Sequence, residues 1–91
     1  VLNRDEENPE ANFAMGMGEL TKGRLKEAEG YLLKVLARRP NEPAVLNNLS
    51  IIVRKQGRYK EAEDYARRAI KLLPNVPEVK KTLSDALKHA P

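Results

Sequence analysis

The sequence contains no cysteine, no tryptophan and only one histidine among its 91 residues. Without cysteine the chain forms neither a disulfide nor a zinc–thiolate site, and it has no thiolate nucleophile. Aromatic residues are also scarce, at 4%, so we expect a core of aliphatic side chains. The longest uncharged stretch, residues 43–53, is shorter than the about 20 apolar residues that a membrane-spanning helix needs. We therefore expect no membrane segment.

Positive charge is only slightly in excess, with 17 Lys and Arg against 13 Asp and Glu and a net charge of +4. Basic side chains gather between residues 54 and 71, but Glu61, Glu63 and Asp64 are interleaved with them, and few aromatic side chains accompany them to stack on bases. We expect no nucleic-acid partner. The composition fits a soluble protein of the cytoplasm or of the periplasm, and the sequence does not decide between these compartments.

Few residues could perform catalysis or hold a metal ion. His89 has no acidic neighbour in sequence, so a solvated side chain explains it better than a general base. Acidic residues recur shortly after two glycines, where we expect the first turn of a helix and a dipole that favours negative charge; they are Glu27, Glu29, Glu61, Glu63 and Asp64. We predict no enzymatic activity, no metal site and no cofactor.

The sequence repeats with a period of 34 residues. Residues 9–42 align with residues 43–76 without a gap and are identical at 10 of 34 positions. The same shift carries Pro43 to Pro77, where a third unit begins. The identical pairs include Pro9 and Pro43, Gly23 and Gly57, Ala28 and Ala62, and Pro40 and Pro74. A period of this length indicates a helical repeat protein.

Each unit is predicted to form two helices joined by a glycine turn. A proline at the start of the unit suits the first turn of a helix, and glycine suits its end. Apolar residues recur every three or four positions on both sides of the turn, which indicates amphipathic helices. The predicted apolar faces are Ala28, Tyr31, Leu32, Val35, Leu36; Leu46, Leu49, Ile52, Val53; Ala62, Tyr65, Ala66, Ala69, Ile70, Leu73; and Val79, Leu83, Ala86, Leu87. No alternation with period two predicts a strand.

With this period the chain resembles the tetratricopeptide repeat family. The resemblance is carried by small residues seven positions before each turn glycine, alanines five positions after it and a closing proline, namely Gly16, Ser50, Ala28, Ala62, Pro40 and Pro74. It implies an all-α fold, a right-handed superhelix of helix-turn-helix repeats with five helices. Where the family favours large residues the first helix has Asn12 and Glu19, so we expect it to pack less well than the helix around Leu46 and Val53.

The period also predicts the organisation of the chain. We expect two full repeats, at residues 9–42 and 43–76, followed at residues 77–91 by a capping helix or the first helix of a third repeat. Residues 1–8 are either the end of an earlier repeat or a disordered tail. If an earlier repeat has been removed, the apolar surface that it covered is exposed. In that case we expect self-association through the N-terminal end. Because the sequence begins with Val1 rather than methionine, we expect a fragment of a longer protein.

In the family, one stripe on the first helix of each repeat lines a concave surface that holds extended peptides or partner helices. The resemblance therefore implies a peptide groove here. The corresponding residues are Phe13, Met17 and Leu20 in the first unit, Asn47, Ile51 and Arg54 in the second, Lys81, Asp85 and Lys88 in the third, and Asn48, at a position where asparagine often contacts the ligand backbone. This stripe is apolar at its N-terminal end and mixed in charge at its C-terminal end, so an apolar anchor beside an acidic residue suits it.

We predict a non-catalytic protein–protein interaction module whose partner is a protein or peptide. The alternative is an architectural spacer or self-association segment within a longer array, with no peptide ligand of its own. In that alternative, Phe13, Met17 and Leu20 pack against an upstream repeat or against a second copy of the chain.

Overall fold

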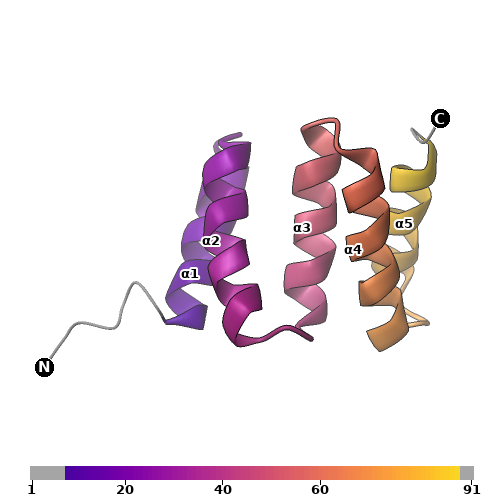
Figure 1. The fold of residues 1–91 in the computed structure, drawn as a ribbon, viewed down its shortest axis with the longest axis horizontal. Helices are drawn as coiled ribbons and strands as arrows, with labels where there is room; N and C mark the ends of the chain where they lie inside the picture. Colours follow the sequence, from indigo (N-terminus) through magenta and orange to yellow (C-terminus); the bar gives the residue numbers. More distant parts are fainter. Residues whose placement is uncertain (1–7, 89–91) are drawn as a thin grey trace, which may run out of the picture.

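The structure, a computed structural model, describes residues 8–88, which form five α-helices and no strand (Figure 1). The helices are α1 (Pro9–Thr21), α2 (Leu25–Arg38), α3 (Pro43–Lys55), α4 (Tyr59–Leu72) and α5 (Pro77–Lys88). In Figure 1, α1 lies behind α2, and α3, α4 and α5 follow across the picture. The predicted all-α helical repeat fold is confirmed. The expectations for His89 and for residues 1–7 lie outside the described residues.

Proline and glycine set the helix boundaries, as the sequence predicts. Pro9, Pro43 and Pro77 are the first residues of α1, α3 and α5, where a missing N–H costs no hydrogen bond. Gly23 and Gly57 follow α1 and α3 with φ of 80° and 85°, a left-handed conformation that glycine adopts without steric cost. After each glycine the next N–H returns to the helix, from Arg24 to the oxygen of Glu19 and from Arg58 to that of Val53, both at 2.9 Å. The two turns therefore have the same geometry.

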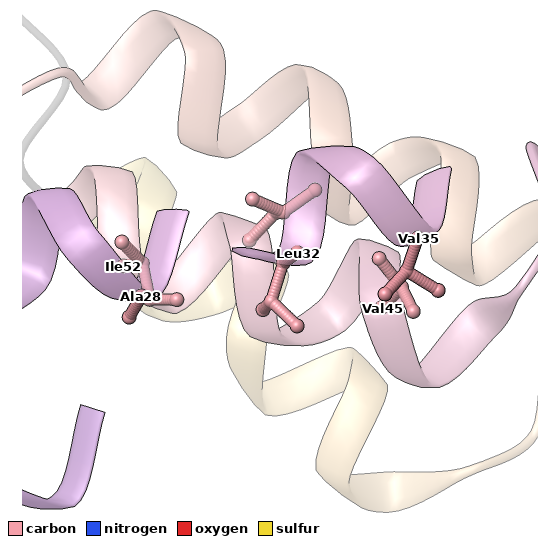
Figure 2. Packing of buried hydrophobic residues seen from close by; sticks show 6 residues of the cluster. Ala28, Leu32, Val35, Val45 and Ile52 are labelled. Carbon is pink, nitrogen blue, oxygen red and sulfur yellow. The ribbon is translucent and has the colours of Figure 1, made fainter. Parts of the chain in front are cut away.

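The core consists of aliphatic residues between successive helices. Its largest cluster joins α2 to α3 and comprises Ala28, Leu32, Val35, Val45, Leu49 and Ile52 (Figure 2). A second cluster, Leu46, Ala69 and Val79, joins α3, α4 and α5, and a third consists of Val53, Ala62 and Ala86. Burying a side chain such as Leu or Ile contributes about 1.5–3 kcal/mol. These clusters fix α3 between α2, α4 and α5.

The first helix is less well buried than α3, as its unusual residues predict. Only Asn12 and Gly16 are buried in α1. In α3 six residues are buried: Val45, Leu46, Leu49, Ser50, Ile52 and Val53. Moreover, α1 meets the rest of the molecule mainly through α2, whereas α3 also packs against α5.

The small residues of the repeat allow close approach between paired helices. Ala28 and Ala62 are fully buried. The buried hydroxyl of Ser50 donates a hydrogen bond of 2.7 Å to the backbone oxygen of Ala62, which ties α3 to α4. A larger side chain at either position would separate the helices.

Two residues of the predicted apolar faces are exposed. Leu73 follows the last residue of α4 and is 37% exposed, because the helical periodicity no longer directs its side chain into the core. Leu87 is 40% exposed, because no helix among residues 8–88 packs on that side of α5. The prediction that both belong to the core is wrong for these two positions.

None of the helices in the described part of the chain has both the length and the apolar character that a membrane crossing requires.

Candidate binding groove

A cavity of about 630 Å³ lies between α3 and α5. We call it the α3–α5 groove. Residues spaced three and four apart on one face of α3 form one wall, because such residues share a side of a helix. Six of the predicted site residues line it: Asn47, Asn48, Ile51, Arg54, Lys81 and Asp85. Leu73, Val76, Glu78 and Thr82 also line it and were not predicted, because they come from the α4–α5 connection and from α5 positions beside the stripe.

Two buried polar atoms in this groove lack a hydrogen-bond partner among the described residues. They are the side-chain oxygen Oδ1 of Asn47 and the Nε of Arg54. The two residues are seven positions apart on α3, which separates them by about 10 Å along one face of the helix. Buried polar atoms are nearly always hydrogen-bonded, so such a pair needs an explanation. Asn48, in contrast, donates its side-chain amide to the backbone oxygen of Ala44 at 2.9 Å.

The α5 wall of the groove carries a local ion-pair network. Lys81 donates a hydrogen bond of 2.9 Å to Asp85, and Lys88 lies 3.7 Å from the other oxygen of the same carboxylate. The hydrogen bond from Lys81 lowers the pKa of Asp85, and the positive charges of Lys88 and Arg54 act in the same direction. Asp85 is therefore ionised at neutral pH and offsets only part of the positive charge at this end of the groove.

Lys88 reaches Asp85 but does not line the α3–α5 groove. It lines a different cavity of about 480 Å³ with Ile70, Leu83 and Leu87, at the surface of α4 and α5. The sequence stripe predicts that Lys88 lines the groove. However, Lys88 is the last residue of α5, and the groove does not extend that far along the helix.

A second cavity, of about 230 Å³, lies between α1, α2 and α3, and we call it the α1–α3 pocket. It is lined by Pro9, Glu10, Phe13, Val35, Arg39, Glu42, Ala44 and Val45. Ala44 also lines the α3–α5 groove, so the two cavities adjoin at the beginning of α3. At the edge of the pocket Arg39 and Glu10 form an ion pair of 2.6 Å, and the hydrogen bond from Arg39 lowers the pKa of Glu10.

The three predicted residues of α1 are therefore not equivalent. Phe13 lines the α1–α3 pocket and packs against the α2–α3 core cluster. Leu20 also packs against that cluster, and Met17 is half-buried and lines neither cavity. Of the three apolar residues in the α1 stripe, only Phe13 therefore lines either of these two cavities.

Arg58 joins the first repeat unit to the second. Its guanidinium donates two parallel hydrogen bonds, of 2.7 and 2.8 Å, to the carboxylate of Glu29, and it also binds Glu61. Gln56 donates a third hydrogen bond to Glu29 at 3.0 Å. The hydrogen bonds from Arg58 lower the pKa of Glu29, whose side chain is only 13% exposed. Such bidentate pairs fix geometry as well as adding energy.

This network corrects the interpretation of the recurring acidic residues. Glu27 and Glu61 do lie in the first turns of α2 and α4, where the helix dipole favours them. Glu29, Glu63 and Asp64 lie further along and are paired instead with Arg58, Arg67 and Lys60. The sequence alone did not show these partners, because the Arg58–Glu29 pair depends on how α2 meets the turn after α3.

Replacing Glu29 with glutamine is expected to destabilise the protein at neutral pH but not in acid. Because Arg58 lowers the pKa of Glu29 below its ordinary value of 4.5, the ion pair stabilises the folded state fully above that value and loses its effect as the pH falls through the lowered pKa. Urea unfolding of both proteins from neutral pH to about pH 3 measures the difference in unfolding free energy. The charge of Glu29 also raises the pKa of Glu61, so the difference reports the Glu29 ion pair together with this coupling. A difference that does not change with pH would contradict the assignment.

The described residues offer no metal centre, since no three His, Cys, Asp or Glu side chains within residues 8–88 are grouped to hold an ion.

Comparison with known families identifies a match. The sequence profile of a tetratricopeptide repeat family matches residues 5–77, which include the first four helices and the start of α5. A search of curated proteins found no match.

Proposed function

Because the chain belongs to the tetratricopeptide repeat family, whose members are generally protein–protein interaction modules, we propose that it binds an extended peptide in the α3–α5 groove. The observation that carries this proposal is the pair of buried, unpartnered polar atoms on α3, Asn47 Oδ1 and Arg54 Nε. Both atoms belong to residues that line the same cavity.

A peptide main chain has the groups that these two atoms require. Once the two side chains turn these buried atoms toward the groove, the N–H groups of a peptide can donate to the oxygen of Asn47, and its carbonyl groups can accept from Arg54. Leaving a buried donor or acceptor unpaired costs about 1–3 kcal/mol, so a ligand that satisfies both recovers that cost on binding. An extended chain presents such groups at regular intervals, which suits two sites about 10 Å apart on one helix face.

The side chains around these atoms favour a particular ligand composition. Ile51 lies between Asn47 and Arg54 on α3, is half-buried, and offers an apolar contact in the middle of the groove. Arg54 and Lys81 give that end of the groove positive charge, which Asp85 only partly offsets. An apolar ligand residue near Ile51 and an acidic one near Arg54 are therefore complementary to this surface.

The proposal is tested by selecting displayed random peptides on the wild-type protein and on the Ile51→Asp variant. We expect peptides selected on the wild type to bind the variant at least tenfold more weakly, since a carboxylate would replace the apolar centre of the groove. Leu33→Asp is the matched control, because Leu33 is an exposed leucine of α2 that does not line the groove. Circular dichroism should show that all three proteins remain helical. Equal binding to the wild type and Ile51→Asp would contradict the proposal.

A second candidate function, an architectural segment of a longer array, is favoured by the surface of α5. Leu83, Ser84 and Leu87 border the cavity at the surface of α4 and α5. Their counterparts one period earlier, Leu49, Ser50 and Val53, are buried, with Ser50 bonded to α4. A further helix would cover α5 in the same way. A molecular mass that rises with concentration, together with a failed peptide selection, would support this alternative. Self-association through the N-terminal end stays a prediction.

A further inference from the structure

We propose that the α1–α3 pocket receives a large apolar side chain of the same peptide, about five residues away from an acidic side chain that pairs with Arg54. The inference rests on the proposed function of the α3–α5 groove. It adds a second binding site and a spacing between two ligand residues.

The walls of the pocket are suited to an apolar side chain. Val35 and Val45 are only 2% and 1% exposed, and the half-buried ring of Phe13 forms another wall. Its volume of about 230 Å³ exceeds the about 150 Å³ of apolar cavities known to hold a benzene molecule, so one leucine or phenylalanine side chain fits. At its edge, Arg39 is already paired with Glu10. Arg39 therefore does not offer the pocket a free positive charge.

The pocket and the groove are equivalent parts of the repeated fold. The 34-residue shift maps most lining residues of the pocket onto lining residues of the groove: Pro9 onto Pro43, Glu10 onto Ala44, Phe13 onto Asn47, Arg39 onto Leu73, Glu42 onto Val76, Ala44 onto Glu78 and Val45 onto Val79. At the position where the groove has the unpartnered amide of Asn47, the pocket has an aromatic ring. The two sites adjoin at Ala44, so one extended chain can occupy both.

The charges determine which end of the ligand enters which site. Glu42 lines the pocket and Glu78 lines the adjoining end of the groove, so a ligand carboxylate is repelled there. Arg54 and Lys81 line the groove at residues farther along α3 and α5, where the two positive charges exceed the single negative charge of Asp85 and attract a carboxylate. The acidic residue of the peptide therefore lies at Arg54 and its apolar residue at the pocket.

The length of α3 gives the spacing between the two ligand residues. Val45 in the pocket and Arg54 in the groove are nine positions apart, which corresponds to about 14 Å along the helix and places them on opposite sides of it. Crossing the about 10 Å diameter of α3 brings the separation to about 17 Å. An extended peptide advances by about 3.3 Å per residue, so about five residues cover that distance, and a much shorter separation cannot place both side chains.

The test uses synthetic peptides in which one leucine and one glutamate are separated by different numbers of serines, with binding measured by fluorescence anisotropy. The wild type should bind most tightly when the two residues are about five positions apart. Replacing the leucine with serine should weaken binding about tenfold, the range expected for removing an apolar group from a pocket. The Phe13→Asn variant has at position 13 the residue found at the equivalent position 47. On this variant, replacing the peptide leucine with serine should have no effect on binding. In Arg54→Gln, replacing the glutamate with glutamine should have no effect.

Met17→Asn is the matched control, since Met17 lies on α1 and lines neither cavity. If Phe13→Asn does not fold, Ala44→Leu provides the second variant, because this exposed position adjoins the pocket and a larger side chain there blocks it. Binding that requires the glutamate and Arg54 but not the leucine would overturn this inference and leave the proposed function standing. No peptide binding better than one made only of serine would overturn both.

Discussion

Replacing Leu49 with alanine is expected to lower the free energy of unfolding by about 3–5 kcal/mol. Leu49 is fully buried in α3 and belongs to the cluster that joins α3 to α2. Truncation removes apolar contacts and leaves a cavity that Leu32, Val35 and Ile52 cannot fill, because they are themselves buried in close-packed surroundings. Small domains have a total stability of about 5–15 kcal/mol, so this one change removes a large part of it.

Urea unfolding followed by circular dichroism measures the effect of Leu49→Ala. Leu33→Ala is the matched control, because Leu33 is a helical leucine that is 40% exposed, and its truncation should change stability by no more than about 0.5 kcal/mol. Equal effects of the two substitutions would mean that α3 is not the central helix of the core. That result would also remove the rigid support on which the groove residues of α3 depend.

Replacing Gly16 with valine is expected to cost about 1–3 kcal/mol through overpacking. A Cβ atom on Gly16 would lie 2.9 Å from Cδ2 and 3.1 Å from Cγ of Leu32, and 3.3 Å from Cβ of Tyr31. Leu32 is fully buried and has no space into which to move. Valine adds two methyl groups beyond that Cβ, so α1 has to separate from α2.

Gly18, two residues further along the same helix, provides the matched control for Gly16. A Cβ there would have no neighbour within 4 Å, so Gly18→Ala meets no steric obstacle. It should instead stabilise the protein by about 0.5–1 kcal/mol, because alanine loses less backbone entropy than glycine in a helix. Thermal unfolding of the two variants should shift in opposite directions. Shifts of the same sign would contradict the packing of α1 on α2.

Most of the fold could be predicted from the sequence because its signals are local and repeated. Pro9, Pro43 and Pro77 begin helices, and Gly23 and Gly57 end them, for steric reasons that act within a few residues. The spacing of apolar residues in α3 correctly predicts four of its six buried residues, since one face of a helix follows from its period. It does not include Val45 and Ser50, which are also buried. The repeat then supplies the second pair of helices from the first.

The sequence was less informative about the candidate site, because a cavity depends on how helices approach one another. The stripe on α1 suggests three equivalent groove residues, but only Phe13 lines one of the two cavities. The resemblance singles out Asn48, whereas the unpartnered amide oxygen belongs to Asn47. Arg58 bridges Glu29 and Glu61 across two repeat units, and no local pattern identifies that bridge. Each of these features depends on distances between helices rather than on position within one helix.

Different residues of α3 stabilise the fold and line the proposed binding groove. Leu49 and Ile52 point into the core from α3, and Asn47, Ile51 and Arg54 line the cavity from the same helix. Substitutions of the first group should change unfolding, and substitutions of the second should change binding with the fold preserved. This separation follows from the helical period, which places the two sets on different faces.

The most direct test of the central claim is a nuclear magnetic resonance titration of the protein with the leucine–glutamate peptide of five-residue spacing, observing the side-chain Nε–H of Arg54 and the side-chain amide of Asn47. We predict that both signals shift, while the backbone signals of Leu83 and Leu87 stay unchanged. Shifts confined to Leu83 and Leu87, with the signals of Asn47 and Arg54 unaffected, would contradict the proposal that the α3–α5 groove is the binding site.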